Sequence, residues 1–330
     1  MLITSRTPLR VSFFGGGTDY PEYFERYPGA VVGMAIDKYI YVSALKLGSF
    51  IEYKYRVSYS RLERVDEIAE IQHPVIRHVL DRYKVEDALD ISIMSDLPAN
   101  SGLGSSSAFT VGFLNLINTL QGKRTTKLDL SRDAIHVERN LLKERVGVQD
   151  QLHAAFGGIN RFDFVDGRIR ITPVQMTAAC QAALMQSLLL VYTGTTRHAS
   201  ATLVDQIAAT KENKIARELD HLLTLTTQAV NLLEGEDPDR LLSNFGALMH
   251  EGWMTKRKLS GNVSNPEIDR LYEAGRAAGA LGGKLCGAGG GGFLLMVVPV
   301  PSQAAFIDAI KPATVVPINV DTQGSMILRS

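Results

Sequence analysis

The chain contains little cysteine and no excess of charge of either sign. Cys180 and Cys286 are its only cysteines, too few for a disulfide framework or a cysteine metal cluster. Lysine plus arginine and aspartate plus glutamate each number 35, so the net charge draws the protein neither to nucleic acid nor to an anionic membrane. The opening residues MLITSRTPLR lack the apolar core of a signal peptide, and apolar runs such as FLLMVVPV are far shorter than the roughly 20 residues that span a bilayer. We therefore expect a cytoplasmic protein that acts on small molecules and binds neither nucleic acid nor membrane.

The 330 residues, 45% of them hydrophobic, are enough for a large core and two domains. Branched and aromatic residues predict strands at 9–14, 30–37, 39–45, 51–60 and 89–97. The same part of the chain contains predicted helices at 73–84, 105–121 and 129–145, and a predicted hairpin at 157–164 and 167–172. The second part has a buried strand at 188–194, helices within 198–258 and at 266–280, and a strand, glycine loop and strand at 283–298. We predict domains at 1–175 and 176–330, with the boundary between 170 and 180.

The most unusual stretch is PANSGLGSSSAF, from Pro98 to Phe109, between a predicted strand and a predicted helix. Glycines let a ligand approach the main chain, and the serines fall where the first N–H groups of a helix have no intrahelical partner. Such a helix start binds phosphate readily. A serine N-cap on an ordinary helix is the simpler alternative. The lysine of a Walker A loop is missing, and Gly104 to Ala108 only loosely imitates a hydrolase nucleophile elbow.

Two further glycine segments lie near the ends of the chain. Near the start, GGGTDY ends a predicted strand and offers the Thr18 hydroxyl and the Asp19 carboxylate to a polyol, although Asp19 could simply cap the following helix. Near the end, Gly287, Gly289 and Gly292 spell G-x-G-x-x-G, but the loop runs into a strand and not into a helix, which excludes a dinucleotide-binding fingerprint. Four consecutive glycines there indicate close approach to a ligand or to facing backbone, with a plain glycine hairpin as the alternative.

In this order the three segments resemble the motifs of the GHMP small-molecule kinases. RTPLRV followed by GGGTDY is similar to the first motif of the family, LPANSGLGSSSA to the second, and KLCGAGGGGF to the third. The resemblance implies an α/β (α+β) fold, with an N-terminal domain like domain 2 of ribosomal protein S5 and a ferredoxin-like C-terminal domain. The active site would lie between these domains.

By this resemblance, residues of the second motif would hold the ATP phosphates: Pro98, Gly102, Leu103, Gly104, Ser105, Ser106 and Ser107. Ser106 and Glu138 would contact Mg²⁺, which prefers hard oxygen ligands. Asp150, in GVQDQ, matches the catalytic aspartate that accepts the proton of the attacking hydroxyl. Arg10 matches a basic residue of the first motif and would act on Asp150 as a fixed cation or pair with it structurally.

The sugar would be bound by residues of the first and third motifs: Gly16, Gly17, Thr18, Asp19, Gly289 and Gly290. Arg197, with Lys256 or Lys258, would meet a phosphate already carried by the substrate.

GGGTDYPEY and GGKLCGAGGGGFLL most resemble the branch that acts on D-glycero-D-manno-heptose 7-phosphate. The activity implied is phosphorylation of the anomeric C1 hydroxyl to give the 1,7-bisphosphate, a step towards nucleotide-activated heptose for surface polysaccharide. The alternatives are a fucose- or galactose-like 1-kinase, a sugar- and ATP-binding sensor without activity and, more remotely, a serine hydrolase. The expected partners are ATP and a sugar phosphate, and a homodimer is the assembly considered.

Overall fold

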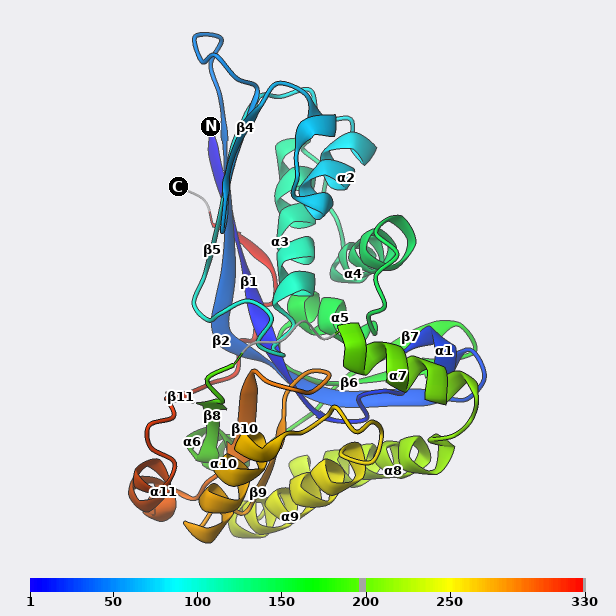
Figure 1. Cartoon of the computed structure of the whole chain (residues 1–330), viewed down its shortest axis with the longest axis vertical. Helices are drawn as coiled ribbons and strands as arrows, with labels where there is room; N and C mark the ends of the chain where they lie inside the picture. The colour runs from blue at the N-terminus through cyan, green and yellow to red at the C-terminus, as the bar shows by residue number, and fades with distance from the viewer. Residues whose placement is uncertain (196–199, 329–330) are drawn as a thin grey trace.

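The computed structural model describes residues 1–195 and 200–328, which form two β-sheets with helices packed against them (Figure 1). Within the described residues, the larger sheet has eight strands, in the order β12-β1-β2-β5-β3-β4 with β6 and β7 added beside β2. Its strands are β1 Leu2–Phe14, β2 Gly29–Lys46, β3 Tyr55–Ser58, β4 Leu62–Val65, β5 Leu89–Ser95, β6 Ile159–Val165, β7 Arg168–Pro173 and β12 Met326–Leu328. The smaller sheet is β11-β8-β10-β9, made of β8 Leu188–Tyr192, β9 Gly282–Leu285, β10 Phe293–Val297 and β11 Val315–Pro317.

Helices cover one side of the larger sheet and surround the smaller one (Figure 1). With the larger sheet lie α1 Pro21–Phe24, α2 Pro74–Arg82, α3 Ser105–Leu120, α4 Lys127–Ile135 and α5 Gln149–Phe156. The remaining helices are α6 Ala178–Ser187, α7 Ser200–Lys211, α8 Ala216–Leu233, α9 Pro238–Lys256, α10 Pro266–Ala277 and α11 Gln303–Ala309. None of the helices in the described part of the chain is long and apolar enough to cross a membrane.

Strand β2 links the two halves of the larger sheet. Its first part, Gly29 to Met34, pairs with β6, and its second part, Ile40 to Lys46, pairs with β5. The sequence analysis predicted two strands at 30–37 and 39–45, but the structure has one long strand with register shifts against β1. Figure 1 shows β2 bending between its two parts, which explains why its residue pattern reads as two segments.

Several other predictions can be compared directly with the structure. The predicted helix at 105–121 is confirmed as α3, and the hairpin is confirmed by the antiparallel pairing of β6 with β7. The helix predicted at 129–145 is too long. Helix α4 passes into a π-helical stretch, His136–Leu141. Lys143 then has a φ of 57°, a left-handed backbone conformation that ends the helix. Helix α6 was missed because its apolar residues are not gathered on one face.

The end of the chain returns to the beginning. Strand β12, which contains the last described residues, pairs antiparallel with β1 near the start of the chain (Figure 1). Because β1 is also paired with β2, it is held on both sides. The pairing with β2, which sets Arg10 opposite Ala35, positions Arg10 and the glycine segment that follows β1.

Candidate active site

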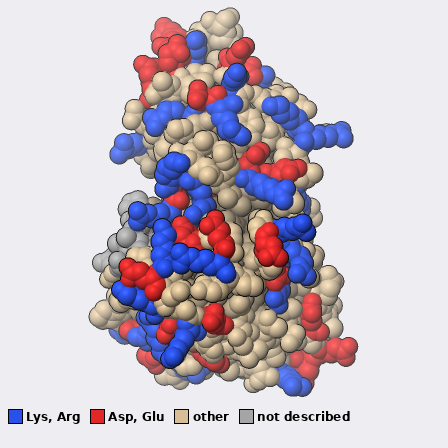
Figure 2. Space-filling view, turned by 90° about the vertical axis from the view of Figure 1, so that its right-hand side faces the viewer, with Lys and Arg blue, Asp and Glu red and all other residues tan. Residues whose placement is uncertain are grey.

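A cavity of about 200 Å³ opens where the two sheets meet, and all three glycine segments reach it. Its walls come from the end of β1, the start of α3, the start of α5, the end of α9 and the loop between β9 and β10. Acidic and basic side chains gather around the middle of the face shown in Figure 2. Segments far apart in the sequence therefore form one polar site.

The centre of the cavity wall is an ion pair between Arg10 and Asp150. Arg10 Nε donates to Asp150 Oδ1 at 2.9 Å, and the second guanidinium nitrogen donates to Oδ2 at 2.8 Å. The Arg10 side chain is 7% exposed and that of Asp150 24%, so the carboxylate remains open to the cavity. Burial alone would lower the pKa of Arg10, but the charge and hydrogen bonds of Asp150 outweigh it and raise that pKa. The two-point contact holds the Asp150 carboxylate in a fixed orientation.

The second glycine segment lies beside this pair. Arg10 also donates to the Gly102 carbonyl, and its backbone N–H donates to Leu103 O at 3.0 Å. Gly104 is the N-cap of α3, with φ of 74°, and no side chain caps the helix. The first-turn N–H groups, including those of Ser105 and Ser106, have no intrahelical acceptor and belong to residues that line the cavity. This arrangement suits an anion such as a phosphate.

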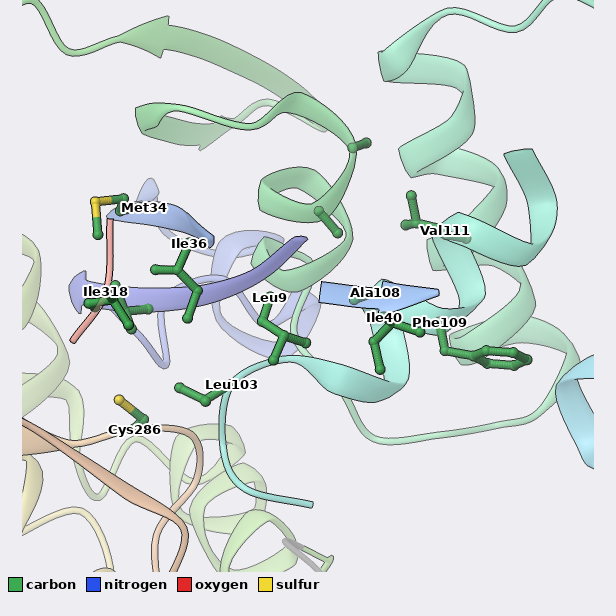
Figure 3. Packing of buried hydrophobic residues seen from close by; sticks show 14 of the residues in the cluster. Leu9, Met34, Ile36, Ile40, Leu103, Ala108, Phe109, Val111, Cys286 and Ile318 are labelled. Carbon is green, nitrogen blue, oxygen red and sulfur yellow. The ribbon is translucent and has the colours of Figure 1, made fainter. Parts of the chain in front are cut away.

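The second and third glycine segments pack against each other through their backbones. Gly102 has φ of 82°, and a Cβ added to it would lie 2.5 Å from the Cys286 carbonyl oxygen. Phe293 N donates to Ser101 O at 3.2 Å. Leu103 is fully buried and lies close to Leu9 and Cys286 (Figure 3). The contact explains why both segments are rich in glycine.

Not all of the residues predicted to bind ATP line the cavity. Gly102, Gly104 and the three serines line the cavity. Leu103 belongs to the hydrophobic core, and Pro98 is exposed outside the cavity.

The first glycine segment contributes one buried carboxylate to the cavity. Gly16, Gly17 and Asp19 line it. Asp19 Oδ1 accepts from Gly17 N at 3.0 Å and Oδ2 accepts from Gln149 N at 3.4 Å. Burial is the main cause of the raised pKa of Asp19. Asp19 does not cap α1, because the N-cap of that helix is Tyr20.

Thr18 is not brought to the cavity. Its hydroxyl donates to the carbonyls of Gly15 and Ala30, at 2.8 and 2.9 Å, and accepts from Ala30 N. The side chain is fully buried. The hydroxyl therefore fastens the glycine turn to β2, and the substrate contact proposed for it has no support in this geometry.

The third glycine segment reaches the cavity only at Gly287 and Ala288. Gly289 and Gly290, which were predicted to contact substrate, lie instead against the loop after α9. Gly290 N donates to Val263 O at 3.0 Å, and a Cβ on Gly289 would lie 2.7 Å from the Val263 Cα. Because the loop connects β9 and β10 as a turn between strands, the exclusion of a dinucleotide fingerprint is confirmed.

Two lysines line the cavity near this loop, Lys284 buried and Lys256 half-buried. Lys256 Nζ donates to Leu285 O at 2.9 Å and to the Gly287 carbonyl, and Lys284 Nζ donates to Phe13 O at 2.9 Å. Burial lowers the pKa of Lys284 to about 8 and is also the main cause that lowers the pKa of Lys256 well below its usual value. Together with Arg10 they place nitrogen donors beside the glycine loops.

Of the cations predicted to bind a substrate phosphate, only Lys256 lines the cavity. Lys258 is exposed outside it, and Arg197 lies outside the described residues. The sequence analysis missed Lys284, although its position in the segment GGKLCG, directly before the glycine loop, was a usable signal.

Glu138, predicted as a magnesium ligand, is fully buried behind the serines. It accepts from Ser107 Oγ at 2.9 Å, from Thr110 Oγ1 at 3.0 Å and from the Gln151 amide. Burial is the main cause that raises its pKa to about 7, and the three hydrogen bonds oppose the shift. The carboxylate does not line the cavity. Within the described residues, no cluster of three or more histidine, cysteine or acidic side chains could hold a metal ion.

We expect Glu138 to make stability depend on pH. Its pKa of about 7 in the folded protein lies above its usual value of 4.5, so the folded state favours the neutral acid. The free energy of unfolding of the wild type, relative to that of Glu138→Gln, should be greatest below about pH 4.5. It should fall by on the order of 3 kcal/mol as the pH rises from 4.5 through 7. Urea unfolding of both proteins between pH 5 and 8 measures the difference. A constant difference over that range would mean that Glu138 ionises normally.

The fold and this cavity define a small-molecule kinase. A glycine loop at a helix start faces a carboxylate that an arginine holds in place, as phosphoryl transfer requires. No histidine appears among the described residues that line the cavity, so the serines there have no Ser–His pair to support the serine hydrolase alternative.

Comparison with known proteins places the chain in a family. Residues 69–158 match the GHMP kinases N terminal domain, and residues 233–311 match the GHMP kinases C terminal model. The chain belongs to the GHMP kinase family and is a phosphotransferase. Kinases of this family use ATP.

The curated relatives include sugar kinases. The chain is 28% identical to the D-glycero-alpha-D-manno-heptose 7-phosphate kinase of Campylobacter jejuni, over 94% of this chain and 93% of the relative. It is 25% identical to the bifunctional fucokinase/GDP-fucose pyrophosphorylase of Arabidopsis thaliana, over 90% of this chain but only 30% of that longer protein.

Solved structures confirm the fold. A D-glycero-D-manno-heptose 1-phosphate kinase from Bacteroides thetaiotaomicron has a TM-score of 0.76 at 22% identity, with 99% of each chain covered. Lactococcus lactis galactokinase complexed with galactose has a TM-score of 0.76 at 19% identity, with 98% of this chain and 95% of that chain covered. The mixed α/β fold of the GHMP kinases is thus the fold of this chain.

Proposed function

We propose that the protein is an ATP-dependent sugar kinase that phosphorylates an anomeric C1 hydroxyl, with D-glycero-D-manno-heptose 7-phosphate as acceptor. The observation that carries the proposal is the Arg10–Asp150 pair, which lies between the phosphate-suited start of α3 and the Asp19 side of the cavity. The Asp150 carboxylate therefore lines the cavity that would hold both the ATP phosphates and the sugar. That position suits a general base.

In the proposed reaction Asp150 accepts the proton of the sugar hydroxyl as its oxygen attacks the γ-phosphorus of ATP. The bond from that phosphorus to the β,γ-bridging oxygen breaks, and ADP leaves. Arg10 keeps the Asp150 carboxylate aligned by its two hydrogen bonds. The N–H groups at the start of α3 and the charges of Lys256 and Lys284 stabilise the phosphates.

Magnesium is part of the proposal. Mg²⁺ commonly takes few protein ligands and completes its shell with substrate phosphates and water, and when bound it would neutralise phosphate charge. Ser106 on the cavity wall fits such a ligand set. Glu138 is proposed as the acidic group, because its carboxylate accepts from Ser107 Oγ at 2.9 Å and Ser107 lines the cavity.

The choice of acceptor rests on the likeness to the Campylobacter jejuni enzyme, whose name gives a heptose 7-phosphate as substrate. The product would be a 1,7-bisphosphate for nucleotide-activated heptose and surface polysaccharide. A fucose- or galactose-like 1-kinase is the second candidate, since relatives with those names also match over most of this chain.

A product panel tests the proposed function. The protein is incubated with ATP, Mg²⁺ and one acceptor at a time: heptose 7-phosphate, L-fucose, D-galactose, D-mannose or R-mevalonate. We expect phosphorus NMR to detect a new anomeric phosphate only with sugars, most rapidly with heptose 7-phosphate, and to detect none when EDTA replaces Mg²⁺. Phosphorylation of R-mevalonate alone would overturn the sugar assignment, and sugar and ATP binding without any product would indicate a sensor.

A further inference from the structure

Two buried polar atoms on the Asp19 side of the cavity have no partner. Ser12 Oγ and Gln149 Oε1 form no hydrogen bond, although both side chains line the cavity and are only 8% and 7% exposed. Leaving such a group unpaired costs about 1–3 kcal/mol. A bound ligand that pairs both atoms would recover this loss.

Both side chains border the same small space above Gly16. A Cβ added to Gly16 would lie 3.7 Å from Ser12 Oγ and 3.6 Å from Gln149 Nε2, which are ordinary contact distances. No other heavy atom comes within 4 Å of that point, apart from the neighbours of Gly16 in the chain. The two polar side chains thus flank one unfilled position that a ligand atom can occupy.

The chemistry of this position favours hydroxyl groups. The Gln149 backbone N–H donates to the Asp19 carboxylate at 3.4 Å. The Gln149 amide brings its nitrogen, a donor, 3.6 Å from this position, its oxygen is an acceptor without a partner, and the neighbouring Asp19 carboxylate is a further acceptor. Ser12 can donate or accept. A hydroxyl group can both donate and accept and therefore fits these partners, whereas a carboxylate has no proton to donate to Gln149 Oε1 and would share the cavity with the Asp19 carboxylate.

We propose that Ser12 and Gln149 are specificity residues that bind neighbouring hydroxyl groups of the acceptor and turn its anionic end away. The proposal rests on the proposed function, because it assumes that the acceptor is a polyol. It assigns the space above Gly16 to the ligand. Gly16 is then glycine because any side chain there would fill the hydroxyl position, and its backbone φ does not require glycine.

Gly16→Ala is the sharpest test, because the added methyl meets no protein atom closely and yet blocks the proposed position. Gly261→Ala is the matched control: Gly261 is exposed, has an ordinary φ and has no atom within 4 Å of an added Cβ. Ser12→Ala removes one partner without adding bulk. Calorimetric titration with heptose 7-phosphate, D-galactose and ATP, each without the other substrate, measures binding independently of turnover.

We expect Ser12→Ala to raise the dissociation constant of the sugar that binds wild type by about tenfold, and Gly16→Ala by at least as much. ATP affinity and the thermal midpoint should stay at the values of Gly261→Ala. Sugar binding that is unchanged in Gly16→Ala, or a wild type that binds neither sugar, overturns the proposal. Binding of sugar that is weakened by both variants, but never followed by phosphorylation, supports it while the proposed kinase function fails.

Discussion

Replacing Asp150 with asparagine should lower turnover by about 10²- to 10⁴-fold, with ATP affinity near that of wild type. The amide has nearly the shape of the carboxylate but cannot accept the sugar proton. It also cannot accept from both Arg10 donors, which bond the two Asp150 oxygens in the structure. Initial rates at saturating ATP and sugar, with nucleotide binding measured separately, give both quantities.

Asp90→Asn is the control for this experiment. Asp90 pairs with Arg56 at 2.7 Å and is 21% exposed, close to the 24% of Asp150, but it lies on β5 away from the cavity. We expect Asp90→Asn to keep wild-type turnover within a factor of about two, as suits a half-exposed ion pair remote from the chemistry. If Asp150→Asn retained comparable turnover, Asp150 would not be the base.

Replacing Gly102 with alanine should weaken ATP binding by about 10- to 100-fold and lower the free energy of unfolding by about 2–4 kcal/mol. The new Cβ would lie 2.5 Å from the Cys286 carbonyl, and the backbone at Gly102 has φ of 82°. Relief of this clash must shift the loop that leads into α3, and the N–H groups at the helix start move with it. Nucleotide titration and urea unfolding measure the two effects.

Gly122→Ala is the control that separates backbone strain at a positive φ from a steric clash of the new Cβ. Gly122 has a positive φ of 69° but no atom within 4 Å of an added Cβ, so alanine there meets only the backbone penalty of about 1–2 kcal/mol. We expect its ATP affinity to equal that of wild type. If Gly102→Ala and Gly122→Ala lost equal stability and both kept wild-type ATP affinity, the contact between the glycine loops would not be needed for nucleotide binding.

The sequence allowed good predictions of features that depend on neighbouring residues. The start of α3 after SGLG, the β6–β7 hairpin and the strand–loop–strand around KLCGAGGGGF follow from local backbone preferences, and the structure has all three. The same local patterns failed at β2, where the chain bends without ending the strand, and at α6, whose apolar residues mark no face. In both cases packing against other elements decided the outcome.

The site residues, too, were predicted in part from local sequence. Motifs identified Arg10, Asp19 and Asp150 as candidates, and the cavity contains all three. Motifs also suggested Thr18 and Gly289, whose groups the fold directs to the protein backbone.

By itself, the sequence determined the glycine segments and the helix start they lead into, because backbone conformation and free N–H groups are local properties. Only the tertiary structure decided which side chains share the cavity. Arg10 meets Asp150 across 140 residues because β1 pairs with β2 at Arg10 and α5, which carries Asp150, packs beside β1. Lys284, Ser12 and Gln149 join them for the same reason: strand pairing and core packing set contacts between distant residues, and no short segment encodes those contacts alone.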